Sequence, residues 1–285
     1  MSVGADELVI DEDNFRDHVD VVIDGKTMSK GAIPRDYAKN PVGSYESVRK
    51  FDMDLTPRNE WSSRIKDMEQ SGGLLSQIRL KANAGNPIPS LDQDGYGYCW
   101  AHSPVSAMLL VRARDNQPYV PLSAFSVACP IKHFKDEGGW NPLAYERIMK
   151  FGVAPMSVWP NQSVNRSLDN PDTWKTAARY TITEGIMDLQ PAAYDRNLSL
   201  DQLMTCLLAR MACPVDYNWW GHSICAADPV EIDSSLPLTD LNRWGVRIWN
   251  SWADTYGKLG MAVLRGSKAV PDGATAVSVV TATES

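Results

Sequence analysis

The chain has 285 residues, of which 44% are hydrophobic and 22% charged, enough for one large domain or two small ones with a sizeable buried core. The net charge of −7 argues against a polyanionic partner such as nucleic acid. The sequence contains no run of 18 apolar residues, so we expect no transmembrane helix and no membrane partner. The five cysteines form no CxxC pair and match no zinc-binding spacing, so we expect reduced thiols and neither a metal ion nor a cofactor.

Residues 1–85 are polar and irregular, and we interpret them as an N-terminal extension. The first 24 residues hold eight acidic groups against one arginine and lack the basic and apolar stretches of a signal peptide, which predicts cytoplasmic synthesis. Short strands are expected at 7–10 and 19–23, and a helix at 59–69. Three roles stay open for this extension: a propeptide lying across a cleft, an arm that contacts neighbouring subunits, which we favour, or a plain structural extension.

From residue 99 onward the sequence is more regular. The spacing of apolar residues predicts helices at 99–114, 123–129, 141–151 and 200–211. Alternating apolar residues then predict strands at 215–219, 224–227, 230–232, 244–249 and 261–264. Helices first and antiparallel strands later favour an α+β fold built as two facing subdomains. We divide the chain into the extension 1–85, a main domain 86–266 and a C-terminal tail 267–285.

Cys99 lies at a position that suits a nucleophile. It follows a glycine-rich turn and begins a predicted helix, where the helix dipole and free N–H groups stabilise a thiolate. A neighbouring imidazole would complete its activation. Of the four histidines, His222 follows a glycine and begins a predicted strand, and the side-chain amide of Asn250 could hold its ring in one orientation.

Two segments resemble motifs of the papain family of cysteine peptidases. Residues 93–103, QDGYGYCWAHS, resemble its nucleophile motif, in which a Gln precedes Cys-Trp-Ala by five intervening residues. Asn250-Ser251-Trp252 is similar to its Asn-Ser-Trp-Gly motif. The resemblance covers about residues 86–266. It implies a helical left subdomain whose central helix carries Cys99, and an antiparallel β-barrel-like right subdomain that carries His222 and Asn250.

The resemblance also implies roles for further residues. The Gln93 side chain and the Cys99 backbone N–H would form the oxyanion hole. Trp252 would shield the Asn–His hydrogen bond from water, and Gly138-Gly139 would bind the backbone of an extended substrate. The implied function is hydrolysis of peptide or isopeptide bonds in a polypeptide substrate.

Several positions depart from the family pattern. Tyr96 replaces a cysteine that usually forms a disulfide, His102 replaces an aromatic residue, and Ala253 replaces a glycine. None of these changes removes a group with a catalytic role. They indicate a distant branch of the family, of bacterial or phage type.

A rival hypothesis is a structural or interaction protein on the same fold, since a fold does not impose its chemistry. It would be part of a larger assembly such as a phage virion, as a capsid, decoration or tail component. The N-terminal extension and the C-terminal tail would then contact neighbouring subunits. A cleft at Cys99 that is filled by the N-terminal segment or by another chain would favour this hypothesis, and an open cleft would favour catalysis.

Overall fold

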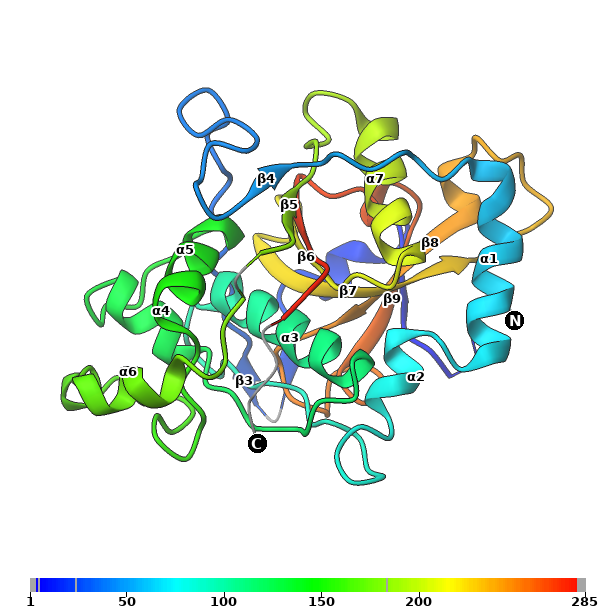
Figure 1. Ribbon diagram of the computed structural model, residues 1–285. Coiled ribbons are helices and arrows are strands. Elements are labelled where there is room, and N and C mark those ends of the chain that lie inside the picture. The colour runs from blue at the N-terminus through cyan, green and yellow to red at the C-terminus, as the bar shows by residue number, and fades with distance from the viewer. Residues whose placement is uncertain (1–3, 5, 24, 183, 281–285) are drawn as a thin grey trace.

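The computed structural model describes residues 4, 6–23, 25–182 and 184–280. Helices pack on both faces of the main sheet: α3 (Cys99–Arg114) packs on one face, called here the helical side, and the helices at 58–71 and 196–208 pack on the other (Figure 1). The helical side also contains α4 (Phe125–Ile131), α5 (Asn141–Phe151) and α6 (Pro171–Ala177). Within the described residues, no helix combines the length and the apolar character needed to cross a bilayer.

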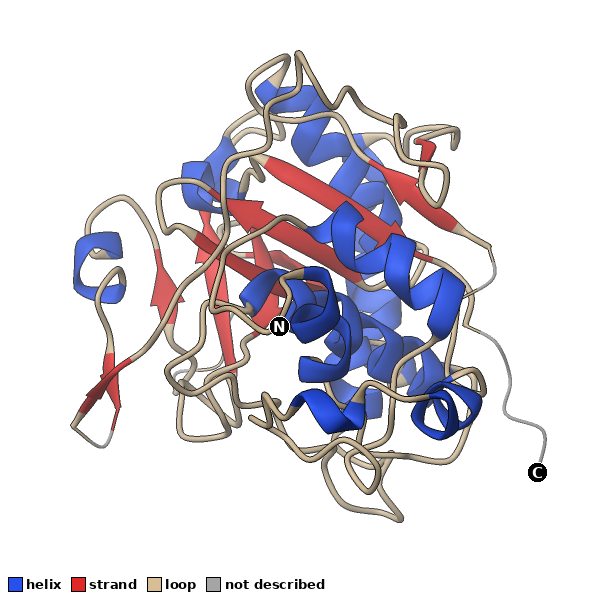
Figure 2. Ribbon diagram, turned by 90° about the vertical axis from the view of Figure 1, so that its left-hand side faces the viewer, coloured by secondary structure: helices blue, strands red, loops and turns tan. Residues whose placement is uncertain are grey.

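The main sheet has eight strands in the order β1-β9-β8-β7-β6-β10-β5-β4. Its centre is antiparallel and consists of β6 (Cys213–Tyr217), β7 (His222–Glu231), β8 (Trp244–Trp249), β9 (Met261–Arg265) and β10 (Gly273–Val277). The parallel pairs stand at the two edges: β1 (Val9–Ile10) beside β9, and β4 (Arg49–Lys50) beside β5 (Ile186–Asp188). The N-terminal segment therefore supplies both edge strands, which leaves the inner strands fully paired. A separate hairpin, β2 (Val22–Ile23) with β3 (Lys26–Thr27), projects from the body in Figure 2.

The central helix α3 begins at Cys99 and ends at Arg114, as its apolar pattern predicts. Every residue of α3 except Arg114 is buried, because the helix is enclosed by the sheet on one side and by other helices on the other. A helix that is apolar on all sides is expected in such an interior position. The first turn of α3 therefore lies at the junction of the two halves, where β7 also begins.

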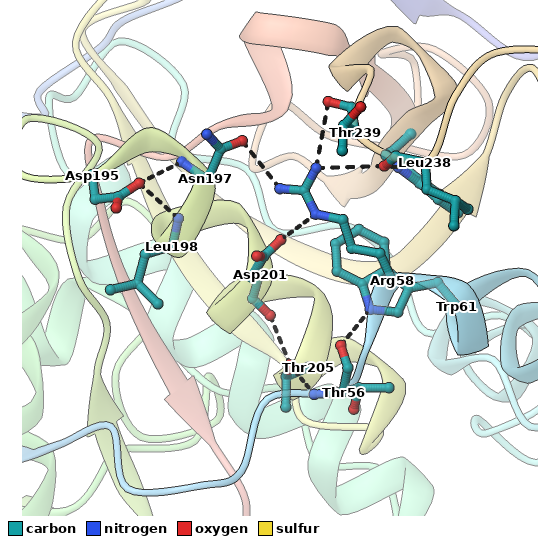
Figure 3. A network of polar contacts seen from close by, with 11 residues as sticks. Thr56, Arg58, Trp61, Asp195, Asn197, Leu198, Asp201, Thr205, Leu238 and Thr239 are labelled. Carbon is teal, nitrogen blue, oxygen red and sulfur yellow. Dashed lines mark hydrogen bonds and ion pairs between the residues drawn. The ribbon is translucent and has the colours of Figure 1, made fainter.

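Residues 56–79 pack as part of the body. They include α1 (Arg58–Ser71) and α2 (Leu75–Arg79). The Trp61 ring of α1 packs edge-on against the Trp244 ring, with 4.9 Å between ring centroids. Figure 3 shows Arg58 joined to α7 (Arg196–Leu208), where Arg58 Nε donates to Asp201 at 2.8 Å. Thr56 N–H donates to the Thr205 hydroxyl at 3.0 Å in the same network. Residues before Thr56 also take part in this packing, since Ile10 and Met28 are buried in the same hydrophobic cluster as Trp61.

Some element boundaries differ from those predicted. Helix α7 spans Arg196–Leu208, where the sequence predicted 200–211, because the Asp195 side chain accepts from Asn197 N–H and caps an earlier start. The strands predicted at 224–227 and 230–232 are one strand, β7, with a bulge between Ala226 and Asp228 that accommodates Pro229. Strand β10 lies within the predicted tail 267–285, of which residues 281–285 are outside the described residues.

Candidate active site

Cys99 is the first residue of α3 and is fully buried. All five cysteines, Cys99 included, are free thiols. Burial raises the pKa of the Cys99 thiol to about 12, and the backbone N–H groups of Ser223, Gly31 and Trp100 oppose this rise. The Cys99 sulfur thus adjoins three backbone N–H groups: that of Trp100 on its own helix, that of Ser223 on β7 and that of Gly31 in the N-terminal segment.

His222 begins β7 and is held by Asn250. The His222 Nε2 and Asn250 Oδ1 atoms are 2.8 Å apart, and the imidazole stacks on the Trp252 ring with 4.5 Å between ring centroids. His222 Nδ1 is buried and has no hydrogen-bond partner among the described residues. Because Ser223 N–H faces the Cys99 sulfur, the backbone next to His222 adjoins the thiol. The fold therefore brings His222, Asn250 and Trp252 into one buried group, and the residue after His222 adjoins the Cys99 thiol.

Gln93 is fixed by three hydrogen bonds. Its Oε1 accepts from the Ser251 hydroxyl at 2.6 Å, and its Nε2 donates to the carbonyls of Tyr96 and Ser29, both at 2.8 Å. Trp252 Nε1 also donates to the Ser29 carbonyl, at 3.3 Å. The amide that was expected to bind an oxyanion thus binds a peptide carbonyl of the N-terminal segment.

Residues 29–33, called here the cleft segment, cross the site in an extended course. Gly139 N–H donates to the Gly31 carbonyl at 2.9 Å, and the Gly139 carbonyl accepts from Ile33 N–H at 2.9 Å. On the other side, Ala32 N–H donates to the Gly221 carbonyl at 3.2 Å. Of the two states expected for the cleft, the filled one is observed, and the occupant is the chain's own N-terminal segment.

The expected peptide-binding glycines are close-packed. A Cβ at Gly139 would come within 2.7 Å of the Trp100 ring, and one at Gly138 within 2.5 Å of the Gly31 carbonyl oxygen. A Cβ at Gly31 would come within 1.9 Å of the Gly97 carbonyl oxygen. These positions require glycine because backbone meets backbone or ring without room for a side chain.

The pairing of the cleft segment with Gly139 is parallel. In this register Gly139 bonds to Gly31 and Ile33, the two neighbours of Ala32, and makes no bond with Ala32 itself. Outside the site, the Lys26 ammonium pairs with Asp94 at 3.2 Å and the Lys30 ammonium with Asp20 at 2.7 Å. These ion pairs are on the surface, so backbone hydrogen bonds and packing contribute most to holding the segment.

The buried site favours uncharged groups. Burial lowers the pKa of His222 to about 3, with a smaller opposing effect from Asn250 and further lowering by Lys30 and His102. Together with the raised pKa of Cys99, this keeps both the thiol and the imidazole neutral near pH 7. A thiolate–imidazolium pair therefore needs the site to be opened to water or substrate.

Sequence reasoning did not find Gly31 or the residues behind Cys99. Gly31 lies in an irregular stretch, and only the folded chain brings it to the sulfur. Behind Cys99, the Ser103 hydroxyl hydrogen bonds to Asn141 Oδ1 at 2.9 Å and to the Ser223 hydroxyl at 2.7 Å. Ser103 is one turn after Cys99 on the same helix face, which is the one signal that could have indicated it. Within the described part of the chain, no three His, Cys, Asp or Glu side chains are grouped to hold a metal ion.

Solved structures of cysteine proteases are similar to this chain. The chain is similar to xylellain, a cysteine protease from Xylella fastidiosa, with a TM-score of 0.56 and 18% identity over 91% of this chain and 99% of that one. It is also similar to a stem bromelain precursor, with a TM-score of 0.53 and 15% identity over 82% of this chain and 76% of that one. This chain has the papain-like cysteine protease fold.

A third similar structure is digestive procathepsin L 3 of Tenebrio molitor, with a TM-score of 0.53 and 15% identity over 70% of this chain and 68% of that one. No protein-family model and no curated protein matches the sequence. The predicted α+β papain-like fold is confirmed, with its Cys99 helix on one side and its antiparallel strands on the other. The roles of individual residues remain predictions.

Proposed function

We propose that this protein is a latent cysteine peptidase whose own N-terminal segment closes the active site. One observation carries the proposal: His222, bonded to Asn250 at 2.8 Å and stacked on Trp252, begins the strand that adjoins the Cys99 thiol at the start of α3. Nucleophile, base and orienting amide are the three parts that such catalysis needs. The papain-like fold supports the same proposal.

In the open enzyme, His222 Nδ1 would take the proton of Cys99, and the thiolate would attack the substrate carbonyl carbon. Gln93 Nε2 and the Cys99 backbone N–H would donate to the resulting oxyanion. The imidazolium would then give its proton to the leaving amine, which leaves a thioester. Water, deprotonated by His222, would attack that thioester and release the acid and the thiol.

The cleft segment occupies the groups that this mechanism requires. Gln93 Nε2 is bonded to the Ser29 carbonyl, and Gly31 N–H faces the Cys99 sulfur. Two of the similar structures are precursors, a procathepsin and a bromelain precursor. Similarity to these precursors supports a closed, precursor-like state for this chain too. A filled cleft favours the structural hypothesis, but it is also the state expected of a peptidase precursor before opening.

Labelling of Cys99 tests the proposed chemistry. We expect an epoxide inhibitor of the E-64 type to alkylate Cys99 of the native full-length protein slowly, because only the small opened fraction, in rapid equilibrium with the closed form, can react. The His222→Ala variant should react about 10- to 100-fold more slowly at pH 6–7, since an isolated thiol with an ordinary pKa is only a few per cent thiolate there. Intact-mass measurement and peptide mapping would locate and time the modification.

Cys129 provides an internal control, because it is another buried free thiol outside the site. Its reactivity should not depend on His222. Equal alkylation of Cys99 in the wild type and in His222→Ala would contradict the proposed pairing.

We also expect acid to favour opening of the cleft segment. The closed site lowers the pKa of His222 to about 3 from an ordinary value of 6.5, so its neutral form is required for closure. In the Cys99→Ala variant no thiolate–imidazolium pair can form, so as the pH falls below 6.5 the opened site binds a proton on His222 that the closed site does not, and the closed state loses stability. Hydrogen exchange at the Ala32 and Ile33 amides of this variant, corrected for the intrinsic pH dependence, should therefore accelerate from pH 6.5 towards 4. Unchanged protection across this range would argue against the linkage.

The alternative function is a structural or interaction protein of a larger assembly such as a virion, with vestigial catalysis. The filled cleft is the observation that favours it. On this hypothesis the cleft segment never leaves, and Cys99 stays unreactive at all pH values at which the protein is folded. The labelling experiment therefore separates the two functions.

A further inference from the structure

A buried polar cluster lies beneath the peptide-binding edge of the site. Asn141 Oδ1 lies within hydrogen-bond distance of the Ser103 hydroxyl at 2.9 Å and the Ser223 hydroxyl at 2.8 Å, and the two hydroxyls are 2.7 Å apart. All three side chains are buried, and Ser223 also turns its N–H towards the Cys99 sulfur. The close packing of these three polar side chains forms one wall of the site, called here the polar wall. It runs from Ser103 on α3, one turn after Cys99, to Ser223 on β7, which is paired with Asp216 on β6.

This wall borders a small cavity of about 10 Å³, which is lined by residues of the N-terminal extension and by residues of the rest of the chain, called here the body. The body contributes Asn141, Asp216 and Thr275, and the N-terminal segment contributes Arg35 and Tyr37. The space would hold one water molecule at most. The N-terminal segment thus fills this pocket as well as the site at Cys99, and its departure would enlarge the pocket by the volume of two large side chains.

The N-terminal segment places a basic side chain against this pocket. The Arg35 guanidinium pairs with the Asp188 carboxylate at 2.9 Å, and the Arg35 side chain is only 5% exposed. The guanidinium also lies 4.8 Å from the Tyr37 ring centroid and 5.2 Å from that of Tyr45. Tyr37 and Tyr45 belong to the N-terminal extension, like Arg35 itself, whereas Asp188 lies on β5 in the body. When the segment leaves, Asp188 therefore loses its cation.

Asp216 on β6 has a carboxylate oxygen without a partner. Its Oδ1 is shielded from solvent and has no hydrogen-bond partner among the described residues, and the same holds for Nδ2 of Asn141, which is 0% exposed. Burial raises the pKa of Asp216 to about 7, although the Ser223 hydroxyl, the Asn141 N–H and the Arg35 charge act to lower it. A buried carboxylate in this state is stabilised by a cation that binds next to it.

The register of the cleft segment relates this pocket to a substrate residue. Gly31 lies at the Cys99 sulfur, and Ala32 is opposite Gly139. Trp252 and His222, which would protonate the leaving amine, lie at the Ser29–Lys30 end of this segment. The residues before the cleaved bond would therefore lie at the Gly139 end, in a substrate that runs opposite to the cleft segment, and its second residue before that bond would be opposite Gly139. Trp140 is extended (φ −142°, ψ 158°), so Asn141 points to the opposite side from Trp140, into the pocket beneath that second residue.

We propose that Asp216 selects substrates with an arginine or lysine as the second residue before the cleaved bond. This specificity rests on the proposed peptidase function. Asp188 on β5 adds a second carboxylate to the pocket, and Asp272 lies near enough to Asp216 to affect its charge. A basic side chain would replace Arg35 of the departed segment, whereas an acidic one would be repelled.

Paired thiol-directed reagents test this specificity. Acyl-dipeptidyl chloromethyl ketones with Arg, Leu or Glu as the second residue from the reactive carbon would be applied to the native full-length protein. The rate of Cys99 alkylation, followed by intact mass, should be about tenfold higher for the Arg reagent than for the Leu reagent. All reagents meet the same opening equilibrium, so it cancels from the ratio of their rates. Asp216→Asn should bring the Arg-to-Leu ratio close to one.

Asp172→Asn, at an exposed position on α6, is the matched control and should leave the ratio unchanged. Asp216→Glu should retain a preference for the Arg reagent because it keeps the charge. A Leu reagent that reacts as fast as the Arg reagent in the wild type overturns the proposal, even if Asp216→Asn fails to fold. A preference for Arg that survives in folded Asp216→Asn also overturns it. Absence of Cys99 alkylation by every reagent overturns the peptidase function as well, which separates the two failures.

Discussion

In the Cys99→Ala variant, we expect peptide hydrolysis to fall by about 10⁴-fold or more, to the background of the assay. Removal of the nucleophile from a nucleophile–base unit removes most of the rate enhancement, because the remaining groups act only through it. The measurement is kcat/KM for a quenched fluorescent peptide, compared with a variant that carries the same substitution elsewhere. Since the closed form limits turnover, both proteins should also carry the opening substitution Gly31→Ala.

The matched control is Cys129→Ala, which removes a buried thiol from α4, away from His222 and Asn250. It should keep its hydrolytic rate if the protein remains folded. Circular dichroism and the unfolding midpoint would establish folding for both variants. Hydrolysis that persists undiminished in Cys99→Ala would show that the thiol is not the nucleophile.

Gly31→Ala should release the cleft segment and raise the rate of Cys99 labelling on the order of 100-fold. A Cβ at this position would lie 1.9 Å from the Gly97 carbonyl oxygen and 2.4 Å from its carbon. Both are backbone atoms next to the start of α3, so the overlap cannot be relieved by a change of side-chain rotamer. The segment must move away from Cys99, which exposes the thiol to the reagent.

Gly95→Ala is the control for this substitution. Gly95 lies in the loop before Cys99, and a Cβ there would meet nothing within 4 Å. Its labelling rate should equal that of the wild type. Gly31→Ala that reacts no faster than Gly95→Ala, while hydrogen exchange at Ala32 shows the segment released, would contradict closure of the site by this segment.

In the proposed peptidase, the closed site would hold the catalytic side chains in an inactive state. With the pKa of Cys99 raised to about 12 and that of His222 lowered to about 3, both by burial, neither group carries a charge at neutral pH. Removal of the segment would return water to the site and reduce both effects. The same segment pairs with Gly139 in parallel register, so it occupies the substrate's hydrogen-bonding groups with a different geometry.

Local sequence patterns determined the elements that carry the site. The glycine-rich turn before Cys99 and the helical spacing of the apolar residues after it predicted α3 with the bounds it has, because this spacing places those side chains on the faces that the helix buries. The motif at 250–252 likewise indicated the Asn250 side chain that bonds to His222. These predictions depended on neighbours in the chain or on short motifs.

Tertiary structure alone decided how the site is closed and what surrounds it. Gly31 reaches Cys99, and Arg35 reaches Asp188, through contacts between residues far apart in the sequence. Nothing in the local composition around residues 29–35 specifies these partners, because pairing through backbone hydrogen bonds is open to almost any sequence. The charge states of Cys99 and His222 also follow from burial, which depends on the packing of the whole chain and not on the residues beside them.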